Sequence, residues 1–222
     1  LHGVTTVIAG NCGFTIAPLV GVEGGPVRAD DADYLMRMLA RVEGMPLTSL
    51  QQGVPWGTWR TFGEWLDCLE GNLAVNAGFM VGHSALRRLA MGERAIGNHA
   101  DDTELATMTR LLAESLEAGG LGFTSSWATS HNDAQGDPVP SPHAGRDEMI
   151  ALASVCRNYD GTTLEFIPTV GRFEQPLGDL AQADNPRVLP VFPRPSENRR
   201  AQAHPVTCRS GTFDGAEVRA LL

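Results

Sequence analysis

The stretch TELATMTRLLAESLEAGGLGFTSS, residues 103–126, predicts a helix that is followed directly by a strand. The apolar residues of its first part recur three and four positions apart, as on one helix face: Leu105, Met108, Leu112 and Leu116. Gly119 and Gly120 end this helix, because glycine readily adopts the backbone conformation that closes a helix. A helix that leads at once into a strand is typical of α/β folds.

The same alternation extends in both directions along the chain. Besides residues 121–126, strands are expected over 4–9, over 74–87 with a loop at Gly82-His83, and over 161–171. Besides residues 103–118, helices are expected over 30–43, over 146–158, and after a capping box formed by Thr61 and Glu64. Strands that alternate with helices in this order predict a parallel sheet with helical crossovers.

Two architectures fit this order, a doubly wound sheet and a (β/α)8 barrel. No glycine-rich phosphate-binding motif follows any of the strands, so the sequence does not support nucleotide binding. In a barrel, the residues at the carboxyl ends of the strands face the active site. Here those residues are rich in ligand and hydrogen-bonding groups: Cys12, His83, Ser125, Ser126 and Glu165. We therefore predict the barrel.

Composition limits the function further. A formal net charge of −9 argues against a nucleic-acid partner, since phosphate binding needs clustered positive charge. No run reaches the ~20 apolar residues of a membrane helix, so no membrane partner is expected. The four cysteines are far apart and form no CxxC pair, which indicates a reducing, cytoplasmic setting. Because the chain has no lysine, a carbamylated lysine is excluded as a metal bridge. The oligomeric state is not predicted.

The last part of the chain differs from the rest. Residues 182–210 contain many prolines and arginines and show no clear periodicity, which counts against an ordinary helix or strand there. Either a long loop or a segment whose reading frame was disturbed explains this composition. We predict two regions, a partial barrel over residues 1–175 and a proline- and arginine-rich tail over 176–222.

Three segments give a family resemblance. HGVTTVIAGNCGF (2–14), GHSALRRLAMG (82–92) and ELATMTRLLAESLEAGGLGFTSS (104–126) resemble, in this order, signatures of the N-acyl-D-amino-acid deacylases of the amidohydrolase superfamily. The resemblance covers about residues 2–175 and implies about strands two to five of a metal-dependent (β/α)8 barrel. It also implies zinc-dependent hydrolysis of the amide bond of a small N-acyl-amino acid, a carbon–nitrogen bond outside peptides.

The resemblance makes Cys12 a zinc ligand, and a thiolate is a ligand that zinc prefers. It also shows departures, because the family's His-x-His pair would precede Leu1 and its later histidine and catalytic aspartate would follow Leu222. We therefore expect no catalytic residue within this chain and no activity from it alone. Where the family has a fifth-strand histidine, this sequence reads TTLEFIP, and period-two alternation turns Glu165 into the barrel as a possible second ligand.

The remaining candidates are expected to bind substrate. Arg87 suits bidentate binding of a substrate carboxylate, against the alternative of an ion pair with an acidic residue. His83 follows a strand, where a hydrogen bond that braces the loop is an equal alternative. Ser125, Ser126 and Trp127 are expected to border the acyl pocket, against the alternative of a capped turn with a packed indole. Cys12 and Glu165 have alternatives too, a buried thiol and a buried ion pair with an arginine.

Two other functions remain open. Another amidohydrolase activity would cleave a cyclic amide, as hydantoinases and dihydroorotases do. Alternatively, the chain is not catalytic, because an open part of a barrel lacks most of the metal ligands and exposes strand edges.

Overall fold

A computed structural model describes residues 3–19, 29–167 and 188–190 of the chain. The strands are β1 (Thr6–Ala9), β2 (Asn76–Phe79), β3 (Val81–Gly82), β4 (Gly122–Ser126), β5 (Thr163–Ile167) and β6 (Val188–Pro190). The α-helices are α1 (Ala29–Val42), α2 (Leu47–Gly53), α3 (Phe62–Leu69), α4 (His83–Met91), α5 (Asp102–Glu117) and α6 (Arg146–Val155). Short 3-10 turns form η1 (Asn11–Gly13), η3 (Gly92–Ala95), η4 (Ser141–His143) and η5 (Cys156–Asn158).

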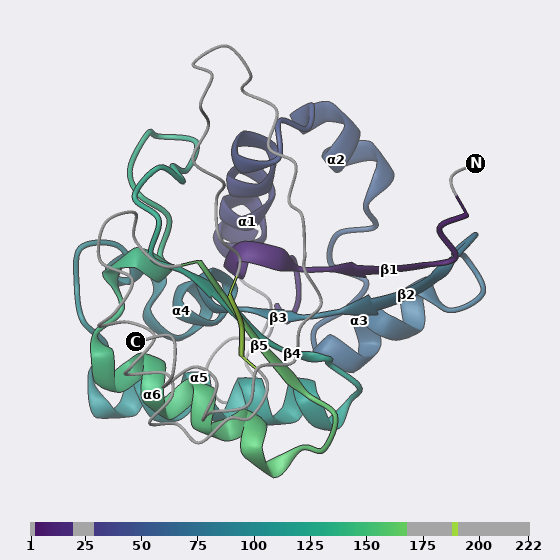
Figure 1. The fold of residues 1–222 in the computed structure, drawn as a ribbon. Helices are drawn as coiled ribbons and strands as arrows, with labels where there is room; N and C mark the ends of the chain where they lie inside the picture. Colours follow the sequence, from purple (N-terminus) through teal and green to yellow (C-terminus); the bar gives the residue numbers. More distant parts are fainter. Residues whose placement is uncertain (1–2, 20–28, 168–187, 191–222) are drawn as a thin grey trace, which may run out of the picture.

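The strands are parallel and pair in the order in which they occur along the chain (Figure 1). β1 pairs with β2, and β3, β4, β5 and β6 form a second sheet. Only Met80 separates β2 from β3, and its N–H donates to the carbonyl of Ala9, 2.9 Å away. The two ladders therefore follow one another along the same chain segment. The predicted α/β fold with parallel strands is confirmed.

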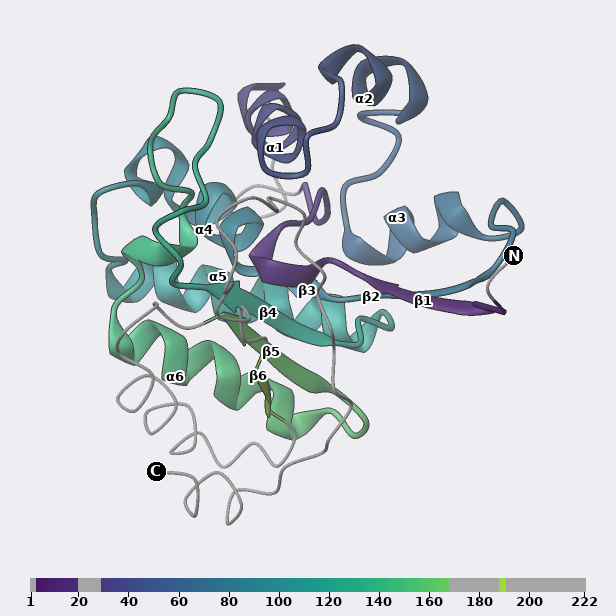
Figure 2. The same ribbon diagram turned by 45° about the horizontal axis from the view of Figure 1, so that its top comes forward.

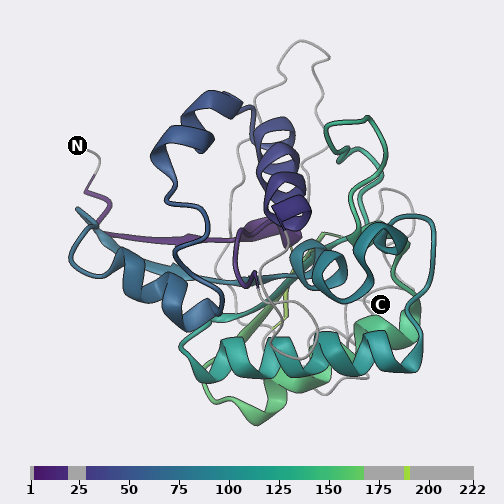
Figure 3. The same ribbon diagram turned by 180° about the vertical axis from the view of Figure 1, so that it is seen from behind.

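Helices lie on both sides of the strands. α5 and α6 lie on one side and α1 and α2 on the other, as Figures 2 and 3 show. Leu164 and Phe166 of β5 are fully buried and belong to the main hydrophobic cluster, to which α5 and α6 also contribute. Glu165, between them in sequence, points to the opposite face of the strand, as the alternation predicts.

β4 and β5 approach each other closely because Gly122 begins β4. This glycine has a φ of 148°, and a Cβ added to it would lie 1.8 Å from the carbonyl oxygen of Thr163. No other residue type fits there without moving the neighbouring strand. The contact fixes the register that places Thr124 of β4 directly opposite Glu165 of β5.

The helix start predicted at Thr61 is confirmed. Its hydroxyl accepts the N–H of Glu64, and the Glu64 carboxylate accepts the N–H of Thr61 in return. The strand expected over residues 74–87, with a loop at Gly82-His83, is wrong after Gly82, because α4 begins at His83 itself. This start has no side-chain cap, so the sequence lacks the usual signal for it. Of the predicted tail, only β6 falls within the described residues. It pairs with β5, so the expectation that residues 182–210 form no strand is wrong at Val188–Pro190.

Among the residues that the structure describes, no helix is long and apolar enough to cross a membrane.

Candidate functional site

The turn that follows β1 has an unusual backbone. Cys12, in η1, adopts a φ of 61°, between Gly10 at 91° and Gly13 at 85°. The left-handed conformation costs an ordinary residue about 1–2 kcal/mol, so cysteine is a poor choice unless its side chain has a role. Residues held in this conformation are concentrated at functional sites. η1 lies against β3, β4 and β5, at the carboxyl end of the sheet (Figure 1).

Glu165 connects this turn to the sheet. The N–H of Cys12 donates to Glu165 Oε1 over 3.2 Å. The hydroxyl of Thr124 donates to Glu165 Oε2 over 3.1 Å, and it accepts the N–H of Gly13 over 3.0 Å. Glu165 is only 6% exposed, and it forms no ion pair with any described residue. The arginine partner considered for it from the sequence is thus not found among these residues.

Burial disfavours the charged forms of both Glu165 and Cys12. Burial raises the pKa of Glu165 to about 7, although its two hydrogen bonds act in the opposite direction. Burial, and then the nearby charge of Glu165, raise the pKa of the Cys12 thiol to about 12. A divalent cation between the two groups would reverse both effects, because it stabilises the thiolate and the carboxylate.

Cys12 and Glu165 therefore fit part of a zinc site. Thiolate and carboxylate are both ligands that zinc takes in proteins, and four ligands complete a structural site. Within the described part of the chain, no group of three or more histidine, cysteine, aspartate or glutamate side chains is arranged to hold a metal. Further ligands would have to come from outside those residues.

His83 lies on the other face of the sheet, away from Cys12. Its Nδ1 is 2.7 Å from Ser125 Oγ, and its Nε2 is 2.8 Å from Glu148 Oε1 on α6. A neutral ring with its proton on Nε2 fits both contacts, since the carboxylate only accepts. Burial lowers the pKa of His83, and the nearby Arg87 lowers it further. The ring is completely buried beside Phe123, so this geometry matches the bracing alternative.

Arg87 belongs to the same buried network. Its Nη1 donates to both oxygens of Glu148, over 2.6 and 2.5 Å. Its Nε and Nη2 donate to the carbonyl oxygens of Ala95 and Asn98. All three nitrogens of the guanidinium therefore donate to protein oxygens, and the side chain is fully buried. The geometry matches the ion-pair alternative and keeps Arg87 out of reach of a substrate carboxylate.

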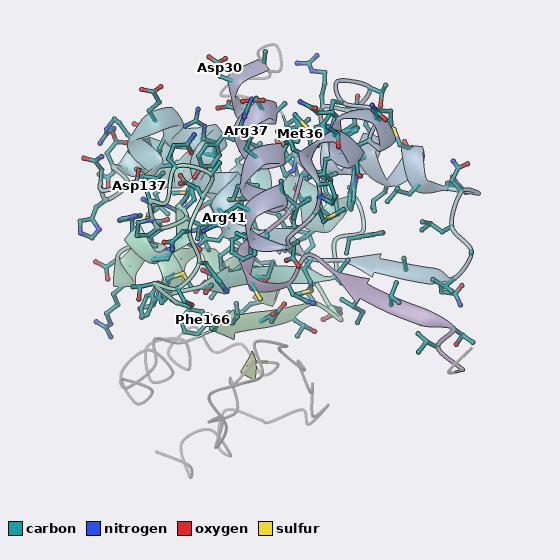
Figure 4. The ribbon with its side chains drawn as sticks, turned by 90° about the horizontal axis from the view of Figure 1, so that it is seen from above. Asp30, Met36, Arg37, Arg41, Asp137 and Phe166 are labelled. Atoms are coloured by element: carbon teal, nitrogen blue, oxygen red, sulfur yellow. The ribbon has the colours of Figure 1, made fainter. Side chains whose placement is uncertain are left out.

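Ser126 and Trp127 lie where β4 ends. Ser126 Oγ accepts the N–H of Ala128 over 3.1 Å and lies 3.4 Å from Nδ1 of His131. The ring of Trp127 packs edge-on against Phe166 of β5, which Figure 4 labels, with centroids 5.2 Å apart. The indole N–H of Trp127 is buried and has no hydrogen-bond partner in the described structure, so it remains available as a donor. Figure 4 also labels Asp137, in the loop after β4.

The structure thus divides the predicted site residues between two faces. Cys12 and Glu165 meet at the turn after β1, whereas His83, Arg87 and Ser125 form a separate buried network. Sequence analysis missed two residues that organise these groups, Thr124 and Glu148. Thr124 is two positions before Ser126 on one face of β4, and Glu148 is four before the inward-facing Leu152 of α6. The sequence spacing shows which face Thr124 and Glu148 occupy, but the residues that they contact lie far away in the sequence.

The buried network predicts a dependence of stability on acid. Glu148 has its pKa lowered to about 2, chiefly by hydrogen bonds and charges from His83 and Arg87 that outweigh its burial. A lowered carboxyl pKa stabilises the fold above its ordinary value, 4.5, and this contribution is lost as the pH falls toward 2. His83, whose pKa is also lowered, destabilises the fold as the pH falls below its ordinary 6.5.

We therefore expect the free energy of unfolding to fall in two stages, below about pH 6.5 and below about pH 4.5, the second on the order of 2–3 kcal/mol. Urea unfolding measured at several pH values checks this. His83→Gln keeps a hydrogen-bonding group but cannot take up a proton, so it should flatten the first stage only. Identical curves for His83→Gln and the wild type would contradict the assignment.

An open surface pocket of about 440 Å³ lies away from these residues, beyond the end of α5 and before β5. Leu116, Leu121, Tyr159 and Thr162 are among its lining residues, and none of the predicted site residues lines it.

Comparison with known proteins assigns the chain to a family. It is 34% identical to the D-aminoacylase of Alcaligenes xylosoxydans xylosoxydans over 126 residues, which cover 55% of this chain and 21% of that protein. It is 36% identical to the N-acyl-D-aspartate deacylase of the same organism over 162 residues, 72% of this chain and 26% of the relative. The chain is a divergent, partial member of the D-aminoacylase family. The resemblance seen in the sequence is confirmed.

Other matches agree with this membership. An uncharacterized protein of Mycobacterium tuberculosis is 34% identical over 181 residues, 76% of this chain and 27% of that protein. Among solved structures, a D-aminoacylase described as defining a novel subset of amidohydrolases matches with a TM-score of 0.52 and 28% identity. That match covers 85% of this chain and 34% of the D-aminoacylase chain. No family model matches. The chain spans about a quarter of the length of the curated relatives it matches.

A second solved structure concerns metal. It is a D-aminoacylase with a binuclear metal centre, activated by one metal and attenuated by the second. It matches with a TM-score of 0.53 and 25% identity, and the match covers 84% of this chain and 35% of the D-aminoacylase chain.

Proposed function

We propose that this chain forms part of a zinc-dependent amidohydrolase that cleaves the amide bond of an N-acyl-D-amino acid. The observation that carries the proposal is the pair formed by Cys12 and Glu165: a strained cysteine beside a buried carboxylate that has no cationic partner among the described residues. The relatives that act on N-acyl-D-amino acids support the substrate class. The metal centre of a D-aminoacylase structure supports the use of a metal.

The proposal includes the barrel architecture over residues 1–175. A doubly wound sheet changes direction at one point in its strand order, and that point binds the ligand. The strands described here show no such reversal, since within each of the two ladders, β1–β2 and β3–β4–β5–β6, every strand pairs with the next along the chain. A continuous parallel order is typical of a (β/α)8 barrel. Within the segment 176–222, β6 pairs with β5 and continues the parallel order, so the proposed barrel also includes Val188–Pro190.

In this proposal Cys12 and Glu165 hold the zinc ion. A bound zinc ion would polarise the acyl carbonyl and lower the pKa of a water molecule. The N–H of Cys12 and the hydroxyl of Thr124 orient the carboxylate of Glu165, so the chain holds this ligand in place before a metal binds. A free thiol ligand also suits a reducing, cytoplasmic setting.

Substrate contacts are proposed for the end of β4. Trp127 offers a buried indole N–H to an acyl or carboxylate oxygen, and Ser126 borders the same strand end. His83, Ser125 and Arg87 act indirectly, because their network holds α4 and α6 against β4. The family's catalytic carboxylate and remaining ligands are proposed to come from other parts of the complete gene product.

A substrate panel tests this function. The complete gene product, loaded with zinc, is expected to release free amino acid from N-acetyl-D-amino acids and not from the L-isomers or from hydantoins. Residues 1–222 alone are expected to release none, because the described part of the chain supplies only two candidate ligands. Release is measured by chromatography of the free amino acid. Turnover of hydantoins only, or none with zinc bound, would contradict the proposed reaction.

A further inference from the structure

We infer that Thr124 is a positioning residue that fixes Cys12 and Glu165 relative to each other for metal binding. Its hydroxyl contacts both parts of the proposed site, the turn that carries the thiol and the strand that carries the carboxylate. This inference rests on the proposed function, because it concerns the same metal site.

The hydroxyl of Thr124 both accepts and donates a hydrogen bond. It accepts the N–H of Gly13 over 3.0 Å and donates its own hydrogen to Glu165 Oε2 over 3.1 Å. The side chain is fully buried, so water does not compete for either bond. Threonine is branched at Cβ and holds few χ1 conformations, which limits movement of the hydroxyl. The hydrogen bonds therefore run in one direction from the turn, through Thr124, to the carboxylate.

The two hydrogen bonds of Thr124 each constrain one proposed ligand. At Glu165, Oε2 is held by Thr124 and Oε1 by the N–H of Cys12, so the carboxylate plane cannot rotate without breaking a hydrogen bond. An ionised carboxylate has about four acceptor positions, and these bonds leave others for a metal ion. At the turn, the bond to Gly13 fixes the peptide that directly follows Cys12, whose φ of 61° needs such support.

The position of Thr124 follows from the sheet. Thr124 and Glu165 are direct partners in the parallel β4–β5 register, and both side chains face η1. Ser125, the next residue, points to the opposite face and bonds His83. On β4, the hydroxyl of Thr124 therefore contacts both the turn that carries Cys12 and the carboxylate of Glu165. These contacts explain why a polar residue occupies this fully buried position.

Three variants test the inference, with cobalt(II) as the probe. Thr124→Val keeps the shape but removes both hydrogen bonds, and Thr124→Ser keeps the hydroxyl. Thr162→Val is the matched control, because Thr162 is also buried and donates to the carbonyls of Cys156 and Tyr159, before β5 and away from Cys12. The complete gene product is titrated with cobalt(II) against a chelator, and the thiolate-to-cobalt absorption band is recorded.

Thr124→Val is expected to bind cobalt(II) about 10–100-fold more weakly than the wild type, the usual effect of removing a hydrogen bond to a metal ligand. Thr124→Ser and Thr162→Val should stay within about threefold of it. Wild-type affinity in Thr124→Val would overturn the inference while leaving the proposed metal site intact. Absence of the thiolate band in the wild type would overturn the proposed site, and this inference with it.

Circular dichroism shows whether each variant folds. If Thr124→Val does not fold, Thr124→Ala removes the hydroxyl without placing a methyl group against Glu165, and its affinity is compared with that of Thr124→Ser. Equal affinities for alanine and serine would overturn the inference, and a loss in alanine alone supports it.

Discussion

Replacing Arg87 with methionine is expected to lower the free energy of unfolding by about 3–5 kcal/mol, because it leaves the buried charge of Glu148 without its arginine partner. Arg87 is completely buried and donates to both oxygens of Glu148 and to two backbone carbonyls. Methionine matches the length of the side chain but supplies no donor. Urea unfolding of the variant and the wild type at pH 7 measures the difference.

Arg110 provides the matched control for this prediction. It pairs with Glu114 on the surface of α5, where both side chains are about half exposed, and such pairs contribute little. Arg110→Met should therefore leave the urea midpoint close to that of the wild type. If Arg87 instead serves to bind a substrate carboxylate, Arg87→Met would keep the wild-type midpoint and raise only KM.

The second large effect is expected at Cys12. Cys12→Ser should weaken zinc binding by more than about 100-fold, since removing a ligand costs more than the 10–100-fold typical of the groups that support ligands. Serine is almost the same size but is a poor zinc ligand at neutral pH. Zinc content after dialysis against a weak chelator measures the loss.

Two further cysteines control for nonspecific thiol effects. Cys68 lies in α3 and Cys156 in η5, directly after α6, and both are free thiols away from the turn after β1. Cys68→Ser and Cys156→Ser should retain wild-type zinc content. Glu165→Gln should lose zinc as well, because an amide carries no charge to balance the cation. Retention of zinc by both Cys12→Ser and Glu165→Gln would refute their assignment as ligands.

Helices were predicted well where short-range sequence patterns, such as apolar spacing and capping residues, determine them. The apolar spacing over residues 103–118 predicted α5, and the Thr61 and Glu64 capping box predicted the start of α3. α4 was missed because its start at His83 depends on burial against the strand, without a side-chain cap. Alternation alone predicted that Glu165 faces away from Leu164 and Phe166.

The same alternation could have divided the candidate site. Consecutive residues of a strand face opposite sides, so Ser125 and Ser126 could not both line one pocket. The structure places Ser125 with His83 and Thr124 with Glu165. What sequence could not supply was the partner of His83, because Glu148 lies 65 residues later on another helix. Such long-range contacts are set by how α4 and α6 pack on the sheet.

Zinc K-edge X-ray absorption of the complete gene product tests the central claim, that Cys12 holds a metal ion. We predict one sulfur neighbour at about 2.3 Å from zinc, present in the wild type and in Cys156→Ser and lost in Cys12→Ser. A wild-type spectrum with only nitrogen and oxygen neighbours, or a sulfur neighbour that persists in Cys12→Ser, would contradict it.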